Sequence, residues 1–504
     1  MVLTQTDRGS SSSLKSLEPK EFRPLKVFFL SSDTGGGHRA SAESLGVQFE
    51  TIFPGSTYSL LDLTKFQSAN AVESYKHLSS HPKQWNVVYK VSNSRLGVGI
   101  LKTYTKITTE KALRQTLKEA DPDVVISVHP LMCNTPVYSC SKISAETGKH
   151  LPMFTVVTDL GSGHTTWFEK GVEKIFIASD SIRNIALKRG KVPANKLIMS
   201  GLPIRKDFAT QASYIGKSRD SVQAKVHQEN MRDQLQLSKS EGNENHKIIL
   251  LMGGGEGVGS LSSIVECIYS ELTLAHMNAT IVVVCGRNDK LKTSLKERNW
   301  DEVLASYINR TKDMKDRVSH GLKEIASMTK RTLSLRSEHE KGEKSDRNHI
   351  QKGENTEEDE QGSNVIVHPL GFVNNMAEYM VASDILVTKA GPGTIAEAAA
   401  VGLPVLLTSF LFGQEEGNVD FVLEKKFGAY KADKNPREIA ETVSSWLQNP
   451  SLLSEMSKYA LEAGRPNAAE EIVRKIGKSV IRWKESHPED NVKGLNHQVS
   501  QVSC

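Results

Sequence analysis

The 504-residue chain has few cysteines, few aromatic residues and no large excess of charge of either sign. Its five cysteines are odd in number and include no C-x-x-C pair, which argues against a disulfide framework or a zinc ribbon and favours a reducing compartment. The 64 Lys and Arg residues exceed the 59 Asp and Glu residues by only five, so a protein that coats nucleic acid is excluded. No apolar run approaches the roughly 18 residues of a membrane span. We therefore expect any membrane contact to be peripheral.

Residues 1–24 are rich in serine and lack the apolar segment of a secretory signal. They are expected to be a flexible leader or the remnant of a transit peptide. Asp7, Glu18 and Glu21 count against the second interpretation, because transit peptides are poor in acidic residues.

From Leu25 onward, short runs of β-branched residues alternate with longer amphipathic stretches, which is typical of β-α units that build a parallel sheet. The expected strands form two series, at residues 25–32, 123–128 and 153–158, and then at 247–252, 279–285, 364–369, 384–388 and 403–408. The fold class expected is α/β, with two Rossmann-like domains that face a cleft. The predicted divisions of the chain are a first domain in residues 25–205, a linker with a charged helix in 206–246, a second domain in 247–450, C-terminal helices in 451–486 and a tail in 487–504.

A charged insertion is expected at residues 302–363 of the second domain. Its part from 330 to 363 holds seven basic and nine acidic residues in 34 positions, with almost no aliphatic ones. A segment that buries so little apolar surface cannot offset the entropy lost on ordering. We expect a largely disordered surface loop; a solvated charged helix is the alternative.

Two glycine-rich segments directly follow expected strands, SDTGGGHRASA at residues 32–42 and LLMGGGEGVGS at 250–260. Glycines let the backbone approach a ligand, and the helix that follows points free N–H groups into the turn. The first segment lacks the Lys-Ser/Thr of a P-loop, so ATP hydrolysis is not expected there. His38 stands at the helix start, where the helix dipole favours a neutral imidazole that can act as a base. The alternative is that His38 only caps the turn.

A third turn, TKAGPGTIAEAAAVG at residues 388–402, precedes an alanine-rich helix. The Gly391-Pro392-Gly393 turn is predicted to delay that helix until about Thr394, and Thr394 and Glu397 fit a capping box. Glu397 thus has a structural explanation. A helix start at the carboxyl end of a parallel strand is also where phosphates bind.

The segment GQEEGN follows the next expected strand. Its residues Gln414, Glu415 and Asn418 supply the donors and acceptors that recognise sugar hydroxyls, although such loop residues are often merely solvated. Twin Rossmann-like domains occur in dinucleotide enzymes and in GT-B glycosyltransferases. A NAD enzyme needs an acidic residue about 20 positions after its glycines. The nearest, Asp62, lies 27 positions after Gly35, so the fit is poor.

A set of motifs together resembles the monogalactosyldiacylglycerol synthases, which are GT-B glycosyltransferases of family 28. The motifs occur in family order from about residue 25 to residue 480: SDTGGGHRASAES, PDVVISVHPLM, TVVTDLGSGHTTWF, GLPIR, LLMGGGEG, CGRN, GFVNNM, TKAGPGTIAEA and GQEEGNV. The resemblance implies an inverting transfer of galactose from UDP-galactose to 1,2-diacylglycerol, at the plastid envelope. It implies no metal or other cofactor, and the sequence holds no His/Cys cluster with metal-ligand spacing.

The resemblance also implies where the substrates bind. The acceptor belongs in the first domain, where His38 is the expected base and Asp159 either orients it or is itself the base. Trp167 is expected at the acceptor entrance or, alternatively, in the core, and Gly36 and Gly37 on the acceptor side. His129 and His164 are expected either to face the same cleft or to be structural.

The expected donor site lies in the second domain and in the segment that leads to it. The expected donor-site residues are Gly254, Gly255, Glu256, Gly391, Pro392, Gly393 and Thr394 for the diphosphate, Phe372 and Val373 for uracil, Arg205 for the nucleotide, Glu397 for the ribose, and Gln414 and Glu415, supported by Asn418, for galactose. The sequence departs from the plant pattern where DLGSGHTTWF replaces DLSTCHPTWF beside the acceptor cleft, and at residues 302–363.

Residues 90–118 carry seven basic side chains and one acidic one, interleaved with apolar residues. We expect an interfacial segment on anionic lipid, with Arg95, Lys102 and Lys106 at the membrane. The alternative is an ordinary solvated helix face.

Other functions stay open at this stage. They are transfer from UDP-glucose or to another lipid, and a non-catalytic protein that binds a nucleotide sugar or anionic lipid. The sequence leaves open whether the chain forms a homo-oligomer, which acyl chains it prefers and which lipid activates it.

Overall fold

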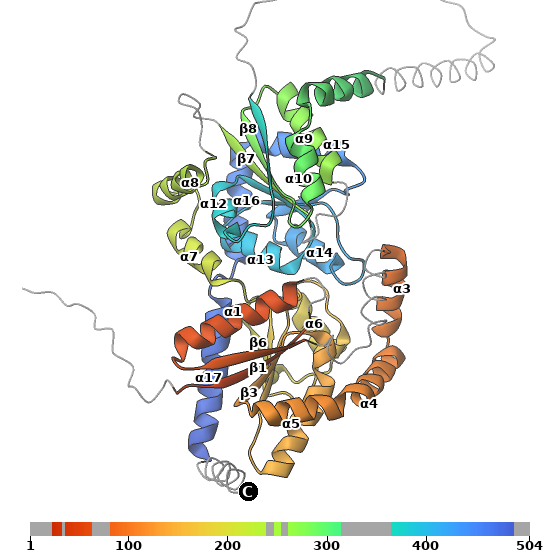
Figure 1. Cartoon of the computed structure of the whole chain (residues 1–504), viewed down its shortest axis with the longest axis vertical. Coiled ribbons are helices and arrows are strands. Elements are labelled where there is room, and N and C mark those ends of the chain that lie inside the picture. The colour runs from red at the N-terminus through yellow and green to blue at the C-terminus, as the bar shows by residue number, and fades with distance from the viewer. Residues whose placement is uncertain are drawn as a thin grey trace, which may run out of the picture.

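The computed structural model describes residues 23–32, 36–62, 81–237, 246–253, 261–313 and 364–487. Two α/β domains follow one another along the long axis of the molecule (Figure 1). Each is built on a six-stranded sheet in which every strand pair is parallel. The expected fold class, two Rossmann-like domains, is confirmed.

The first sheet has the strand order β2-β1-β3-β4-β5-β6. Its strands are β1 (Lys26–Ser31), β2 (Thr57–Asp62), β3 (Val124–Ser127), β4 (Met153–Val156), β5 (Ile175–Ile177) and β6 (Leu197–Met199). The strand order reverses between β1 and β3, and ligands of open α/β sheets bind at the carboxyl side of such a reversal. Strands β1, β3 and β4 lie where the sequence predicts strands, and β2, β5 and β6 were not predicted.

The second sheet has the order β12-β11-β10-β7-β8-β9. Its strands are β7 (Lys247–Met252), β8 (Ala279–Val284), β9 (Val365–Leu370), β10 (Ile385–Thr388), β11 (Val405–Leu407) and β12 (Gly428–Tyr430). Counted from β7, this is the order 3-2-1-4-5-6 of dinucleotide-binding sheets, and its reversal lies between β7 and β10. All five strands predicted for this domain are present.

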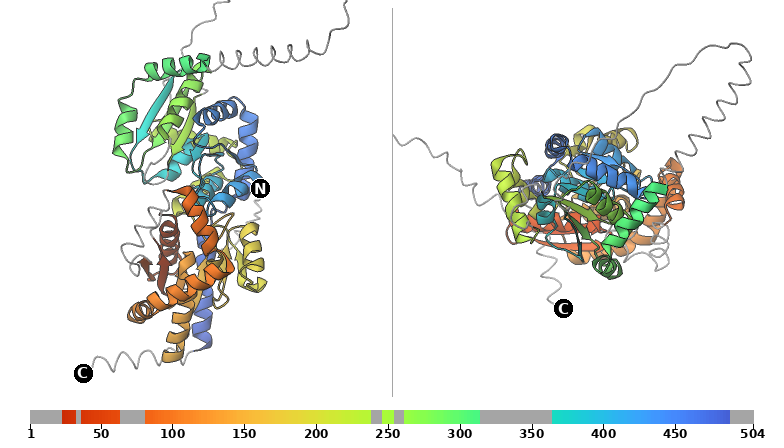
Figure 2. Two further views of the ribbon diagram at one scale, coloured as in Figure 1. Left: turned by 90° about the vertical axis from the view of Figure 1, so that its right-hand side faces the viewer. Right: turned by 90° about the horizontal axis from the view of Figure 1, so that it is seen from above.

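Helices cover both faces of each sheet (Figures 1 and 2). Those of the first domain are α1 (Gly37–Ile52), α3 (Pro82–Ser92), α4 (Arg95–Ala120), α5 (Asn134–Thr147) and α6 (Asp180–Lys188), with short 3₁₀ turns η3 (Pro130–Met132), η4 (Thr165–Trp167) and η5 (Ala194–Lys196). Those that follow are α7 (Lys206–Ile215), α8 (Val222–Gln234), α9 (Leu261–Leu274), α10 (Asp289–Lys296), α12 (Met376–Ala382), α13 (Pro392–Ala400), α14 (Glu416–Glu424), α15 (Pro436–Leu447), α16 (Pro450–Ala463) and α17 (Ala468–Ser486).

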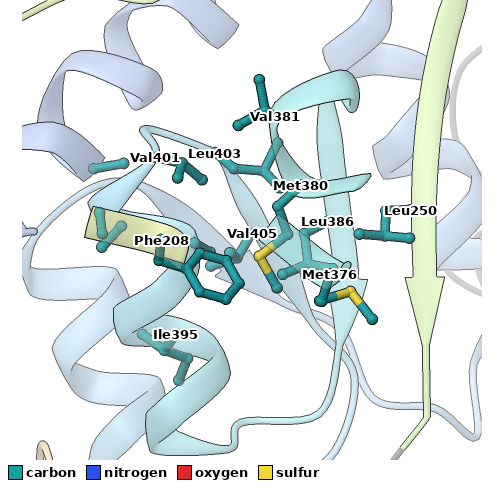
Figure 3. Close-up of a cluster of buried hydrophobic side chains, with 14 of the residues drawn as sticks. Phe208, Leu250, Met376, Met380, Val381, Leu386, Ile395, Val401, Leu403 and Val405 are labelled. Carbon is teal, nitrogen blue, oxygen red and sulfur yellow. The ribbon is translucent and has the colours of Figure 1, made fainter. Parts of the chain in front are cut away.

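The interval expected to be a linker, residues 206–246, holds helices α7 and α8, which pack on the second domain. Phe208 of α7 lies in a buried cluster with Met380 and Val405 of that domain (Figure 3). Arg232 of α8 donates from Nε to the Ala382 carbonyl at 2.9 Å, at the end of α12. The buried apolar residues Phe208, Ile215, Ala224 and Met231 of these two helices belong to the second domain's core cluster.

Helix α17 leaves the second domain and packs on α1 of the first, as Figure 1 shows. Its residues Ile472, Val473 and Ile476 belong to the same buried cluster as Phe49. The chain therefore passes between the domains twice, after β6 and after α16. The two crossings touch, because a Cβ atom added to Gly201 would lie 2.5 Å from Cβ of Arg465.

Part of the expected insertion is helical: residues 300–313 form a helix in which Tyr307 is buried. Residues 314–363, like the leader through residue 22 and the tail from residue 488, lie outside the described residues. None of the helices in the described parts of the chain is both long and apolar enough to cross a bilayer.

We expect Phe208→Ala to destabilise the protein by about 3–5 kcal/mol, because it leaves a cavity in the second domain's core. Chemical denaturation of the full chain measures the change. Tyr214→Ala is the matched control, since Tyr214 lies on the same helix and is 48% exposed. Equal stability of the two variants would show that α7 does not belong to the core.

Candidate active site

Loops at the carboxyl ends of the two sheets meet at the boundary between the domains. The loop after β4 in the first domain contacts the start of α14 in the second. The Gly161 N–H donates to Asn418 Oδ1 at 3.1 Å, and Ser162 Oγ donates to the Gln414 carbonyl at 2.6 Å. The residues predicted for the acceptor and for the donor therefore flank one boundary between the domains.

His38 lies at the reversal point of the first sheet, in the first turn of α1. Gly36 precedes the helix with φ of 78°, a left-handed conformation that favours glycine. The His38 ring packs edge to face against the His129 ring at 4.7 Å between centroids, and its Nδ1 lies 2.8 Å from Thr158 Oγ1. Residues after β1, β3 and β4 thus converge here.

Burial lowers the pKa of His38 to about 4, against the opposing effect of a hydrogen bond to the Val128 backbone. The neutral imidazole that the sequence predicts is therefore present, but desolvation is its main cause rather than the helix dipole. The alternative role as a cap is not seen, because α1 has no side-chain cap and Gly36 occupies that position.

Asp159 is buried beside the domain boundary. Its Oδ2 accepts a hydrogen bond of 2.7 Å from Trp167 Nε1. Burial raises the pKa of Asp159 to about 7, the Trp167 hydrogen bond opposes the shift, and the charge of Glu415 from the other domain adds to it. The carboxylate thus pairs with Trp167, and the ring of His38 is oriented by Thr158.

Trp167 is fully buried in the first domain's core cluster. Of its two expected roles the structure supports packing, and a place at an open acceptor entrance is wrong for this conformation. His129 and His164 accept hydrogen bonds from the N–H groups of Leu131 and Thr166, at the starts of η3 and η4. Both histidines therefore have structural roles.

Helix α13 begins at Pro392, with Gly391 as its N-cap and no side-chain cap. The predicted delay until Thr394 and the capping box are therefore wrong, because proline at the first helical position is compatible with a helix start. Glu397 instead forms a bidentate ion pair with Arg205, Nε to Oε1 at 2.8 Å and Nη2 to Oε2 at 2.9 Å. Burial raises the pKa of Glu397, and Arg205 opposes that shift.

Lys389 is a site residue that the sequence analysis missed. Its Nζ lies 3.1 Å from Glu415 Oε1, and the Leu411 N–H donates to Glu415 Oε2 at 2.9 Å. A Cβ atom added to Gly391 would lie 3.7 Å from Lys389 Cε, so the side chain runs beside the start of α13. A basic residue directly before a glycine turn was the available signal.

The other expected donor residues are distributed as follows. Phe372 exposes 70% of its surface, and Val373 packs partly against the second domain's core. Gln414 is half-buried. The expected diphosphate residues Gly254, Gly255 and Glu256 lie outside the described residues. Across the described ranges no group of three or more His, Cys, Asp or Glu side chains is arranged to hold a metal ion.

The expected membrane segment is helix α4, which lies with α3 on one side of the first domain (Figures 1 and 2). Lys102 pairs with Glu169, and Lys106 lies 3.7 Å from the centroid of the Tyr138 ring. Arg95 is exposed. The cationic contribution is therefore smaller than the sequence suggests, because paired lysines have less charge to offer a membrane.

An exposed apolar stripe runs along α4 instead. It consists of Leu96, Ile100, Tyr104 and Ile107, which are 76%, 62%, 63% and 78% exposed. Steps of four, four and three residues keep side chains on one helix face. On α3, Val87 and Val91 are also more than half exposed.

Comparison with known proteins places the chain in context. A family model described as monogalactosyldiacylglycerol (MGDG) synthase matches residues 38–204, and one described as glycosyltransferase family 28 C-terminal domain matches residues 319–472. Among solved structures, MurG of Acinetobacter baumannii aligns with a TM-score of 0.49 at 11% identity over 89% of this chain and 98% of that one. The glycosyltransferase SnogD from Streptomyces nogalater aligns with a TM-score of 0.46 at 12% identity over 90% and 99%.

Curated relatives are more similar in sequence. The chain is 30% identical to monogalactosyldiacylglycerol synthase 1, chloroplastic, of Arabidopsis thaliana over 480 residues, which are 93% of this chain and 73% of the relative. It is 32% identical to the probable monogalactosyldiacylglycerol synthase, chloroplastic, of Nicotiana tabacum over 482 residues, 92% and 72% of the two chains. With this identity over nearly its whole length, the chain belongs to the monogalactosyldiacylglycerol synthase family.

Proposed function

We propose that the protein transfers galactose from UDP-galactose to 1,2-diacylglycerol with inversion, without a metal ion, at the surface of the plastid envelope. The acceptor oxygen attacks C1 of galactose, the bond from C1 to the diphosphate oxygen breaks, and the acceptor proton passes to a base while UDP leaves. The observation that carries the proposal is the hydrogen-bonded contact between the loop that follows Asp159 in the first domain and the start of α14 in the second, next to the sheet reversal that holds His38.

The donor side of the proposed site is built around α13. Its start offers the backbone N–H groups of Gly393 and Thr394 and the positive end of the helix dipole to the diphosphate. Pro392 has no N–H, and the Gly391 N–H donates to the Lys389 carbonyl at 2.8 Å. Lys389 adds a positive charge beside this turn, and charge on the leaving group is what a metal-free site must stabilise.

Glu397 would accept hydrogen bonds from the ribose hydroxyls. Arg205 acts on the nucleotide through this carboxylate, because its fork holds both oxygens in one orientation. Phe372 and Val373 would contact uracil and Gly254 to Glu256 the diphosphate, and Gln414 and Glu415 would bind galactose.

On the acceptor side His38 is the proposed base. Its ring is half-buried and neutral, and it lies at the point where ligands of such sheets bind. A pKa of about 4 makes a weak base, but the negative diphosphate of a bound donor raises the pKa of a nearby imidazole. The base therefore becomes stronger once the donor is in place.

The pH dependence distinguishes His38 from Asp159 as the base. With His38 as base, kcat/KM for UDP-galactose stays level between about pH 6 and 9. This ratio depends on the free enzyme, in which a group with a pKa of about 4 is deprotonated throughout that range. With Asp159 as base, kcat/KM falls about tenfold per pH unit below its pKa of about 7. We expect the level profile, also in Asp159→Asn, and a loss of about 100-fold or more in His38→Ala.

The Arg205–Glu397 pair predicts how ribose is recognised. Glu397→Gln is expected to raise KM for UDP-galactose about tenfold or more and to remove the preference for UDP over 2′-deoxy-UDP, because a charged hydrogen-bond acceptor is lost. Arg205→Lys should have a smaller effect of the same kind. Titration calorimetry with both nucleotides measures the preference. Glu424→Gln, an exposed position on α14, is the control, and an unchanged preference in Glu397→Gln would refute the assignment.

The apolar stripe of α4 is the proposed contact with the membrane. Exposed apolar side chains on one helix face gain free energy by entering the interfacial region of a bilayer. The exposed Arg95 at the start of α4 adds attraction to anionic lipid. Tyr89 of α3 packs edge to face on His164 at 5.5 Å, so these helices are attached next to the acceptor side of the site. Diacylglycerol would then be reached from the bilayer surface.

We expect the double variant Leu96→Asp with Ile107→Asp to lose binding to vesicles about tenfold or more, measured by flotation. Transfer to vesicle-embedded diacylglycerol should fall in parallel, while UDP affinity stays unchanged. Thr108→Asp with Ala112→Asp adds the same two charges at exposed positions of α4 that are not part of the stripe. Equal loss in that control would mean that charge alone, and not the stripe, decides binding.

Radiolabelled UDP-galactose and UDP-glucose, each with diacylglycerol vesicles, test the transfer itself. Transfer of galactose only supports the proposal, and transfer of glucose only contradicts its donor. Binding of UDP without any transfer would identify a non-catalytic protein.

A further inference from the structure

Asn418 lies where the loops of the two domains meet, and only 1% of its surface is exposed. Its Oδ1 accepts from the Gly161 N–H at 3.1 Å, and its Nδ2 donates to the Ala390 carbonyl at 3.0 Å. One end of the amide thus holds the first domain, and the other holds the turn between β10 and α13. The side chain is therefore held by backbone groups of both domains.

The backbones of the two domains touch beside this amide. A Cβ atom added to Gly161 would lie 1.5 Å from the Gly417 carbonyl oxygen, and one added to Gly417 would lie 2.4 Å from the Gly161 carbonyl carbon. Neither glycine has a positive φ. Closeness between the domains, and not backbone conformation, therefore requires a residue without a side chain at both positions.

The residues on either side strengthen the contact. Leu160 comes from the first domain, but its side chain is buried in the hydrophobic cluster of the second. Ser162 donates to the Gln414 carbonyl. Three successive residues, 160 to 162, are thus attached to the second domain, directly after Asp159 and opposite Glu415.

We infer that Asn418 is a positioning residue whose amide joins the loop after β4, at Gly161, to the turn between β10 and α13, at Ala390. We call this pair of hydrogen bonds the staple, and galactose transfer requires it. The inference rests on the proposed function. The staple fixes the distance between groups that act on the acceptor and groups that hold the donor, and reacting atoms must be held to within about 1 Å for efficient transfer. The donor groups lie on the second domain's side of the contact, so the staple should affect the transfer step and leave donor binding unchanged.

Three variants of the full chain test the inference: Asn418→Ala, Gly161→Ala and the double variant. Each single variant should lower kcat on the order of 100-fold, because either the amide is lost or a methyl group separates the backbones. The KM for UDP-galactose and the affinity for UDP should stay at the wild-type values. The double variant should be no slower than the slower single one, since both changes break one contact. Asn418→Asp, which keeps the acceptor for Gly161, should lie between wild type and Asn418→Ala.

Gly99→Ala is the matched control, because a Cβ atom added there meets nothing within 4 Å. Small-angle X-ray scattering gives a readout independent of activity, in which the staple variants should have a larger radius of gyration than wild type. Four results would each overturn the inference. They are a wild-type kcat in Gly161→Ala, losses of kcat that multiply in the double variant, a loss of UDP affinity as large as the loss of kcat, and a radius of gyration equal to that of wild type. A wild-type chain that transfers no sugar would refute the proposed function. The radius of gyration of the variants would then still test whether the contact between Asn418 and Gly161 holds the domains together.

Discussion

The structure depends on one constraint, that two separately folded domains bring the carboxyl ends of their sheets together. Reaction between an acceptor held by one domain and a donor held by the other is possible only at that boundary. Leu160, Gly161 and Ser162 meet the start of α14 there, at distances that leave no room for a side chain on Gly161. The two crossings of the chain, which touch at Gly201 and Arg465, lie at another part of the same boundary. The loop contact and the crossings together fix how the domains face one another.

Burial at this boundary determines the chemistry of the groups beside it. The same desolvation lowers the pKa of His38 to about 4 and raises that of Asp159 to about 7, because it disfavours the charged form of each. The charged forms of an imidazole and a carboxyl group are thus both disfavoured within one small region. Burial also raises the pKa of Glu397, and its two hydrogen bonds to Arg205 oppose the shift. In both carboxyl groups a hydrogen-bond donor counteracts part of the effect of burial.

The sequence predicts the parts of the fold that rest on local patterns. Continuous apolar runs reveal β7, β8 and β11, although β11 has only three residues. The three-residue strands β5, β6 and β12 and the alternating β2 were not predicted. The helix start at Gly37 follows from glycines after a strand, but the pKa of His38 depends on burial that no local motif records. The Arg205–Glu397 pair joins residues 192 positions apart, so no local pattern predicts it. The sequence offered a capping box for Glu397, and the family resemblance offered the ribose. Helices α7 and α8 are largely polar, so their few core residues could not be predicted from the sequence either.

The departure from the plant pattern at DLGSGH gains a physical meaning from the structure. The sequence analysis placed it beside the acceptor cleft, and the structure places its first glycine against the backbone of Gly417. A side chain at Gly161 would require the loops to separate, because its Cβ atom would lie 1.5 Å from the Gly417 carbonyl oxygen. With glycine there, the amide of Asn418 reaches the first domain directly. Gly161 and Gly417 thus contribute to the site by letting the two loops lie in contact, and not by adding a binding group.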